Sequence, residues 1–267
     1  LYQGMDIGTA KEPEAARQGV PHHLLDIWPV TQTANVADYA KLARTATEEI
    51  TARGRVPILV GGSGLYVRAA LDDLDFPGTD WVIRSRLEDE LTRLGPAALH
   101  ARLAVLDPAA AGAILPSNGR RIVRALEVIE ISGRPFSATM PAYQQNRPAV
   151  QIGLTLPRPE LDRRIAVRVD RMWQAGLEAE VRGLTSQGLR ESRTASRALG
   201  YQQLLRHLDG EWTLDEARLE TIKATRRFAR RQESWFRRDP RITWLDATKE
   251  TLFADVSALI TKGLPSP

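Results

Sequence analysis

The sequence predicts an α/β protein in which a helical insertion interrupts a parallel sheet. Residues 56–60 form a short apolar run that ends in two glycines and precedes a helical pattern, an order typical of parallel α/β sheets. Residues 78–148 contain no convincing strand and are divided by prolines into short helices. Apolar residues alternate with small or polar ones again at 150–156. We therefore expect an α/β core at 1–77 and 149–267 and an insertion at 78–148.

The other segments of the core are predicted to be mainly helical. The spacing of apolar residues predicts helices at 33–54, 158–176, 177–188 and 250–263. Thr213 and Glu216 match the S/T-x-x-E capping box, so a long helix is expected to begin there and to run to about Arg238. Residues 241–247 form a candidate edge strand.

Composition restricts the class of protein. The chain contains no cysteine, which excludes disulfides, a thiolate nucleophile and cysteine-bound zinc. Its histidines are isolated or, at His22 and His23, point apart, so no histidine metal site is expected. No apolar run approaches the roughly 18 residues that a transmembrane helix needs, and no segment resembles a signal peptide. We expect a cytoplasmic protein without a membrane partner.

The basic residues are almost all arginines, and the net charge is +4. This bias fits either codon composition or contact with phosphates, which arginine binds with two parallel hydrogen bonds. One group, Arg120, Arg121 and Arg124, lies within one turn near the expected start of a helix. Positive charge there opposes the helix dipole, so the group indicates either phosphate contact or a solvated face paired with Glu127.

A larger stripe of positive charge lies on the long helix that begins near Thr213. Only Glu233 offsets it along its length. The stripe fits the backbone of a nucleic acid, although an arginine-rich solvated helix has the same pattern. Its members are Lys223, Arg226, Arg227, Arg230, Arg231, Arg237 and Arg238.

Two glycine-containing segments are further candidates for a site. The loop GGSGLY, residues 61–66, follows the predicted strand at the edge where open α/β sheets bind ligands, and Ser63 supplies a hydroxyl there. The loop is either a ligand site or a tight turn, and GxxxxGK[ST] occurs nowhere in the chain. In SRALGYQQL, Arg197 precedes a Leu-Gly step and Tyr201 opens a helix. An arginine at such a junction can bind a phosphate.

Together, six segments resemble bacterial tRNA dimethylallyltransferases, also called tRNA isopentenyltransferases. The resemblance covers nearly the whole chain, and the six segments follow in the family's order and spacing. They are LYQGMDIGTAK, GVPHHLLD, GRVPILVGGSGLYVRAAL, RRIVRALEV followed by SGRP, RALGYQQL, and ATRRFARRQESWFRR.

The resemblance implies a fold related to P-loop nucleotide kinases, with a helical insertion that grips the anticodon arm of tRNA. It also implies transfer of a dimethylallyl group from dimethylallyl diphosphate to the exocyclic N6 amine of the adenine 3′ of the anticodon. Mg²⁺ is the implied cofactor, and a monomer is expected. The diphosphate leaves as an anion, which cations and backbone amides stabilise, and the flipped-out base must reach the same pocket.

The same resemblance assigns roles to particular residues. Arg197 matches the arginine that holds the diphosphate, and Ser63 stands at the threonine of the family's GGTGLY, which touches tRNA. The family's QRxxR element maps onto residues 120–124, with Arg120 in place of glutamine, and Arg84 aligns with a further tRNA contact. The expected tRNA-binding residues are therefore Ser63, Arg84, Arg120, Arg121, Ile122, Val123 and Arg124, and those lining the substrate channel are Gly8, Thr9 and Lys11.

One departure from the family concerns catalysis. The family's P-loop, most of its magnesium ligands and the aspartate proposed as general base precede the segment that matches Leu1. We therefore expect these 267 residues to lack the P-loop and the general base and to be inactive by themselves. Two alternatives remain, a non-catalytic RNA-binding remnant of the family and an adenylate isopentenyltransferase that modifies free nucleotides. The arginine-bearing insertion argues against the second, because a mononucleotide needs no such clamp.

Overall fold

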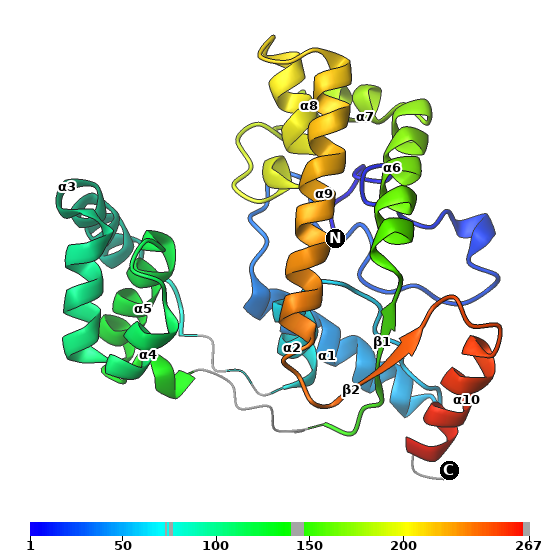
Figure 1. The fold of residues 1–267 in the computed structure, drawn as a ribbon, viewed down its shortest axis with the longest axis horizontal. Helices are drawn as coiled ribbons and strands as arrows, with labels where there is room; N and C mark the ends of the chain where they lie inside the picture. The colour runs from blue at the N-terminus through cyan, green and yellow to red at the C-terminus, as the bar shows by residue number, and fades with distance from the viewer. Residues whose placement is uncertain (73, 75–76, 140–146, 264–267) are drawn as a thin grey trace. The chain divides into compact units, whose positions relative to one another are not determined.

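The computed structural model describes residues 1–72, 74, 77–139 and 147–263. The chain forms two compact units, one made of Leu1–Leu71 and Arg147–Pro267 and the other of Asp72–Asn146. The sequence placed these boundaries a few residues later along the chain. Figure 1 labels the elements of both units and colours them by their position in the chain.

The first unit contains two strands and most of the helices (Figure 1). Its long helix α9 packs against α6 and α8. Its elements are α1 (Val36–Ala52), α2 (Gly64–Leu71), β1 (Gln151–Thr155), α6 (Arg158–Gln174), α7 (Leu177–Thr185), α8 (Tyr201–Leu208), α9 (Leu214–Phe236), β2 (Ile242–Asp246) and α10 (Leu252–Gly263), with 3-10 turns at Glu14–Ala16 and Ala195–Arg197.

Strands β1 and β2 are parallel neighbours, in register from Gln151 opposite Ile242. Gly153 permits this pairing, because a Cβ at that position would lie 2.6 Å from the Trp244 ring. The Arg237 guanidinium also lies over the Trp244 ring, with its Cζ atom 4.6 Å from the ring centroid. The strand at 150–156 was predicted from the alternation of apolar residues, and 241–247 was a candidate edge strand; both are confirmed.

The prediction of a buried strand at residues 56–60 is wrong. These residues adopt neither strand nor helix, and the side chains of Val56, Ile58 and Val60 are 57%, 78% and 88% exposed. An extended segment becomes a strand only when a neighbour accepts and donates its backbone hydrogen bonds. No strand in the described parts of the chain pairs with this run.

Local capping signals set the helix ends as expected. The Asn35 side chain accepts a hydrogen bond from Asp38 N at 2.8 Å and opens α1. The capping box at the start of α9 is present, with Glu216 N donating to Thr213 Oγ1 at 3.2 Å and Thr213 N donating to Glu216 Oε2 at 2.7 Å. These bonds satisfy amide groups that have no partner inside the helix. The predicted start and extent of the long helix are confirmed.

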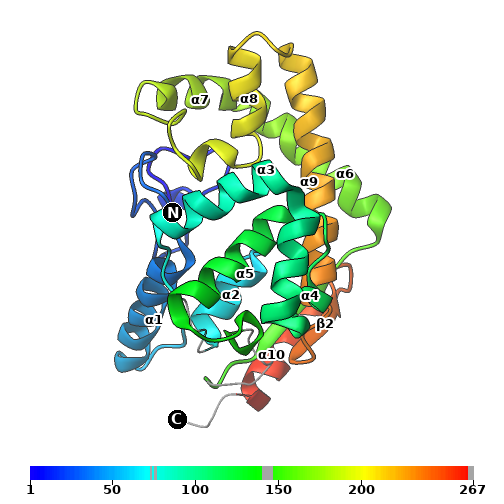
Figure 2. The same cartoon turned by 90° about the vertical axis from the view of Figure 1, so that its left-hand side faces the viewer.

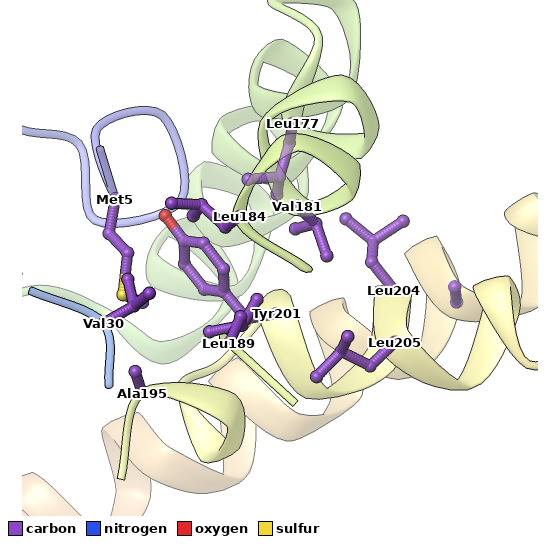
Figure 3. Packing of buried hydrophobic residues seen from close by; sticks show 11 residues of the cluster. Met5, Val30, Leu177, Val181, Leu184, Leu189, Ala195, Tyr201, Leu204 and Leu205 are labelled. Carbon is purple, nitrogen blue, oxygen red and sulfur yellow. The ribbon is translucent and has the colours of Figure 1, made fainter. Parts of the chain in front are cut away.

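The main core of the first unit joins the amino-terminal loop to α7, α8 and α9. Figure 3 shows the fully buried Tyr201 ring among the side chains of this cluster. Its other buried members are Met5, Val30, Leu177, Val181, Leu184, Leu189, Ala195, Leu204, Leu205 and Ala217. Segments almost 200 residues apart in the sequence therefore share one core.

The second unit is helical throughout the residues that the structure describes. It contains α3 (Trp81–Leu106), α4 (Pro108–Ala113), α5 (Gly119–Ser132) and a 3-10 turn at Phe136–Thr139, and Figure 2 shows it from a second side. Helix α3 is kinked at Gly95, whose φ of +79° suits glycine, just before Pro96. The core of the second unit includes Leu87, Leu99, Leu103, Ile122 and Leu126.

Candidate functional site

The first part of the candidate site is the loop at residues 6–8, which is bound to one carboxylate. The backbone N–H groups of Asp6 and Ile7 donate to Glu180 Oε2 at 3.0 and 2.7 Å, and Gly8 N donates to Oε1 at 3.4 Å. The Tyr201 hydroxyl donates to Oε1 at 2.5 Å. We call Glu180, Tyr201 and these three amides the Glu180 clamp. It joins the amino-terminal loop to α7 and α8.

Gly8 is a glycine because of Tyr201. A Cβ at Gly8 would lie 2.4 Å from Cε2 of the Tyr201 ring, closer than real atoms approach. Burial, and then the hydrogen bond to Glu180, raise the pKa of the Tyr201 phenol far above its ordinary value. The phenol therefore remains a hydrogen-bond donor at any physiological pH.

Thr9 and Lys11, which were expected to line the substrate channel, have partners inside the loop. Thr9 Oγ1 donates to Met5 O at 2.5 Å. Lys11 Nζ donates to Tyr2 O at 3.2 Å and to Asp26 Oδ1 at 2.5 Å and also pairs with Asp6. Burial opposes the charge, but the hydrogen bonds that Lys11 donates to the carboxylates of Asp26 and Asp6 raise its pKa above the usual value. Their place in a substrate channel stays a prediction.

Arg197 ends the 3-10 turn Ala195–Arg197 and is exposed. It lines an open pocket of about 280 Å³ together with Arg190, Ser196, Gln202, Leu205, Arg206 and Asp209. Arg190 pairs with Asp209 at 2.6 Å, and Arg206 pairs with Glu211 at 3.1 Å. Within the described residues, the Arg197 guanidinium has no hydrogen-bond or ion-pair partner. It is therefore the cation of this pocket that is free to bind an added anion.

The GGSGLY loop lies against the carboxyl-terminal half of α9. Gln232 Nε2 donates to Gly62 O at 2.7 Å. A Cβ at Gly62 would lie 2.1 Å from that nitrogen, and a Cβ at Gly64 would lie 2.0 Å from the Trp235 indole. Both glycines are thus explained by the close approach of α9. Ser63 is exposed at the start of α2, beside these contacts.

Five of the seven residues in the basic stripe on α9 illustrate two different environments. Lys223, Arg226 and Arg237 have internal partners at Glu220, at the Asp162 carbonyl and at Glu233. Arg230 and Arg238, in contrast, form no ion pair or hydrogen bond with any residue that the structure describes. These two line a second open pocket, of about 340 Å³, with Arg231, Ser234 and Trp235.

In the second unit, two arginines expected to touch tRNA share a buried carboxylate. Glu127 is fully buried and accepts from Arg84 Nε at 3.2 Å and from Arg124 Nη1 at 2.7 Å. Arg124 also donates to the carbonyl oxygens of Gly78 at 3.0 Å and Pro77 at 2.5 Å. The pairing of Arg124 with Glu127, one of the two interpretations of this helix, is therefore present, although Glu127 is buried rather than solvated.

The other residues of the 120–124 segment point in two directions. Arg120 and Arg121 are exposed in the first turn of α5. Ile122 and Val123 are 0% and 1% exposed and belong to the core of the unit. The two arginine side chains thus lie at the surface of the unit, whereas the two apolar side chains hold the helix in place.

Sequence reasoning missed Glu180, Tyr201 and Gln232 as parts of the candidate site. The backbone partners of Glu180 and Gln232 lie 170 or more residues away, and no local pattern marks such a pair. The glycines at 8, 62 and 64 were the available signal, because each one lies where another segment comes too close for a side chain. Glu127 was noticed, but only as a surface partner of the arginines.

The described residues do not fit Mg²⁺ by themselves. No three His, Cys, Asp or Glu side chains within the described ranges come together in a way that could hold a metal ion. Asp6 and Asp26 lie near each other, but both are bound to Lys11. The implied Mg²⁺ therefore stays a prediction.

Where the structure describes the chain, none of its helices is both long and apolar enough to cross a membrane.

Comparison with solved structures gives the class of fold. A tRNA isopentenylpyrophosphate transferase from Bacillus halodurans has a TM-score of 0.70 and 39% identity, with 98% of this chain and 84% of that one covered. The structure of a eukaryotic dimethylallyltransferase acting on tRNA has a TM-score of 0.79 and 24% identity, with 99% of this chain and 71% of that one covered. The predicted α/β fold, a P-loop-kinase-like core with a helical insertion, is confirmed.

Sequence comparison gives the family. The IPP transferase family model matches residues 1–239. A tRNA dimethylallyltransferase from Thermobifida fusca is 68% identical over 260 residues, which are 97% of this chain and 82% of the relative. One from Streptomyces coelicolor is 69% identical over 245 residues, 92% of this chain and 78% of the relative. The chain belongs to the IPP transferase family.

Proposed function

We propose that the protein transfers a dimethylallyl group from dimethylallyl diphosphate to the exocyclic N6 amine of the adenine 3′ of a tRNA anticodon. The observation that carries the proposal is the exposed Arg197 guanidinium, which has no partner among the described residues and lies in a pocket whose other cations are paired. Relatives of 68% and 69% identity are named for this reaction. A cation of this kind is suited to binding the anion that leaves in the proposed reaction.

The chemistry explains why a free arginine is needed. The bond between the allylic carbon and the diphosphate oxygen breaks, the adenine N6 forms the new bond to that carbon, and one N6 proton passes to a general base. The diphosphate departs with its electron pair as an anion. A guanidinium with two parallel N–H groups stabilises that charge as it develops.

Binding of tRNA is assigned to exposed cations in each unit. In the first unit these are Arg230 and Arg238 on α9, with Ser63 on the adjoining loop. In the second unit they are Arg120 and Arg121, together with the exposed parts of Arg84 and Arg124. Ile122 and Val123 contribute by fixing the helix that carries the arginines. Phosphates of the anticodon arm are the natural partners of such groups.

Several finer points stay predictions. They are the absence of the P-loop and the general base from these 267 residues, the inactivity of this polypeptide by itself, the need for Mg²⁺, the cytoplasmic location and the monomeric state. An assay of the 267-residue polypeptide beside the entire gene product tests the first two directly. Transfer by the 267 residues alone would contradict them.

The proposed reaction is tested by incubating the entire gene product with labelled dimethylallyl diphosphate and one of three acceptors. These are tRNA, the same tRNA with guanosine in place of the adenine 3′ of the anticodon, and AMP. We expect label only in the first. Label in AMP alone would indicate an adenylate isopentenyltransferase, and tRNA binding without transfer would indicate an RNA-binding remnant.

The role of Arg197 is tested with Arg197→Ala beside Arg182→Ala, a control on the exposed surface of α7 whose side chain pairs with Glu178. Loss of the free cation is expected to lower kcat about a hundredfold and to change the Kd for tRNA less than about threefold. The control should retain the activity of the wild type. Equal kcat for Arg197→Ala and wild type would remove Arg197 from the site.

A further inference from the structure

We propose that Glu180 and Tyr201 are positioning residues, which hold the loop at residues 6–8 in a fixed place relative to Arg197. This inference rests on the proposed function, because it concerns the geometry of the same transfer reaction. It starts from one observation. The amino-terminal segment is fastened to the chain on both sides of Arg197, at Thr194 and at Tyr201.

The first fastening is at the start of the segment. The Tyr2 hydroxyl is hydrogen-bonded to Thr194 Oγ1 and also donates to Gln32 O at 2.9 Å. Ala34 N donates to both hydroxyl oxygens, at 3.1 Å in each case. Three segments are therefore tied together three residues before Arg197.

The second fastening is the Glu180 clamp. Three consecutive backbone N–H groups point at one carboxylate, an arrangement that binds anions wherever it occurs in proteins. Here the anion is supplied by α7, whose neighbouring residues Leu177, Val181 and Leu184 are buried in the core. Because these three residues fix the rotation of the helix, the carboxylate of Glu180 is held in place before the loop binds it.

Contact between Gly8 and Tyr201 adds a steric limit to these hydrogen bonds. The ring of Tyr201 is fully buried, and it leaves no room for a side chain on Gly8. The loop therefore cannot move toward α8 without a clash, and it cannot move away without losing its three hydrogen bonds to Glu180. Both directions of movement cost free energy.

The backbone between the two fastenings carries Arg197, and the amides of Ala195, Arg197, Ala198 and Gly200 are hydrogen-bonded. Ala195 N donates to Ser192 Oγ at 3.1 Å, Ala198 N donates to Ala195 O at 3.1 Å, and Gly200 N donates to Gln203 Oε1 at 2.9 Å. A displacement of Tyr201 therefore also displaces Arg197, because few backbone dihedral angles between the two residues are free to absorb it. Placement of a reacting group to within about 1 Å can change a rate by about a hundredfold, so such a link bears directly on transfer.

The test uses Tyr201→Phe and Glu180→Gln in the entire gene product. Tyr201→Phe removes one hydroxyl and keeps the ring against Gly8, so the core remains filled. Glu180→Gln keeps the shape of the side chain but has only one acceptor oxygen for donors on both sides. The matched control is Glu178→Gln, because Glu178 lies on the same helix and its short hydrogen bond goes to Arg182 on the surface.

We expect both variants to lower kcat at saturating substrates about tenfold per folded molecule, while the Kd for tRNA and the KM for dimethylallyl diphosphate change less than about twofold. The amides of Asp6, Ile7 and Gly8 should exchange their hydrogens faster in both variants. The double variant should be no slower than the slower single variant, because the two side chains act as one unit. Glu178→Gln should match the wild type in every measurement.

A kcat per folded molecule that equals the wild-type value in both variants overturns the positioning role, even when the proteins are less stable. So does a loss of kcat without faster exchange of the three amides. If the wild-type protein transfers nothing to tRNA, the proposed function fails instead. Exchange of the three amides then still shows whether the Glu180 clamp exists.

Discussion

Glu180 in the first unit and Glu127 in the second each gather several hydrogen-bond donors on one carboxylate, but the donors differ in charge. Glu180 accepts from three backbone amides and a phenol, all neutral. Glu127 accepts from the guanidinium groups of Arg84 and Arg124. The same side chain therefore builds a cluster of charge −1 in one unit and +1 in the other.

Because the donors differ, the two carboxylates hold different parts of the molecule in position. Neutral donors of the backbone are fixed in the chain, so Glu180 determines where a loop lies. Guanidinium groups sit at the ends of long flexible side chains, so Glu127 determines where two cations lie. Removal of Glu180 frees a loop whose amides can turn to water. Removal of Glu127 leaves two half-buried cations with fewer partners, which is the more costly loss.

The largest effect is expected from Glu127→Ala. Loss of the buried carboxylate should lower the free energy of unfolding by about 3–5 kcal/mol, because two cations lose their counter-charge and a cavity forms. Denaturant unfolding measures this change. The control is Glu130→Ala on the same helix, whose pairs with Arg86 and Arg102 are more exposed, and it should cost about 1 kcal/mol. Equal losses for the two variants would contradict the comparison.

The second effect concerns the steric limit in the Glu180 clamp. Gly8→Ala places a methyl group against the Tyr201 ring and should destabilise the protein by about 1–3 kcal/mol. Gly183→Ala is the control, since a Cβ there meets nothing within 4 Å and the residue lies inside α7. It should stabilise the protein by about 0.5–1 kcal/mol. A stable Gly8→Ala protein would show that the loop moves freely.

The third prediction separates exposed from bonded arginines in the second unit. Arg120→Ala should weaken tRNA binding and lower the slope of log K against log salt by about 1, without changing stability. Arg124→Ala should also weaken binding, but it removes bonds to Glu127, Pro77 and Gly78 and should lower the free energy of unfolding by about 1–3 kcal/mol. Identical salt slopes for Arg120→Ala and the wild type would remove Arg120 from the interface.

The smallest effects are expected at extreme pH, and they differ between the units. The folded state holds the pKa of Tyr201 above its ordinary value of 10, so this stabilisation is present below pH 10 and is lost as pH rises beyond it. The pKa of Asp107 is lowered from 3.8: burial raises it, but hydrogen bonds from Ala110 and Ser137 outweigh that effect. Its stabilisation is present above pH 3.8 and is lost as pH falls.

Tyr201→Phe should therefore flatten the loss of stability in alkali, and Asp107→Asn should flatten the loss in acid. Thermal unfolding followed by circular dichroism from pH 3 to 11 measures both slopes. A Tyr201→Phe protein whose alkaline slope equals that of the wild type would show that the phenol titrates normally.

The sequence was sufficient wherever the cause of a structure is local. The capping box at Thr213 lies within four residues, and the alternation at 151–155 lies within five, so both elements were predicted correctly. The α/β fold class was also predicted correctly, from the alternation at 150–156 and the family resemblance, although the strand expected at 56–60 is not formed.

Contacts between distant segments could not be predicted in the same way. Residues 56–60 have the composition of a strand, but a strand requires a partner, and composition does not name one. The carboxylate of Glu180 finds amides about 173 residues away, and Glu127 finds Arg84 in another helix. In each case the deciding term is a tertiary contact, which a single sequence does not display.

The two fastenings around Arg197 also affect the order in which the protein is assembled during synthesis. Tyr2 and Gly8 leave the ribosome early, but their partners Thr194 and Tyr201 are added almost 200 residues later. The amino-terminal loop must therefore wait, with Met5 uncovered, until α7 and α8 have emerged. The candidate site therefore takes its final form only after α8 has been synthesised.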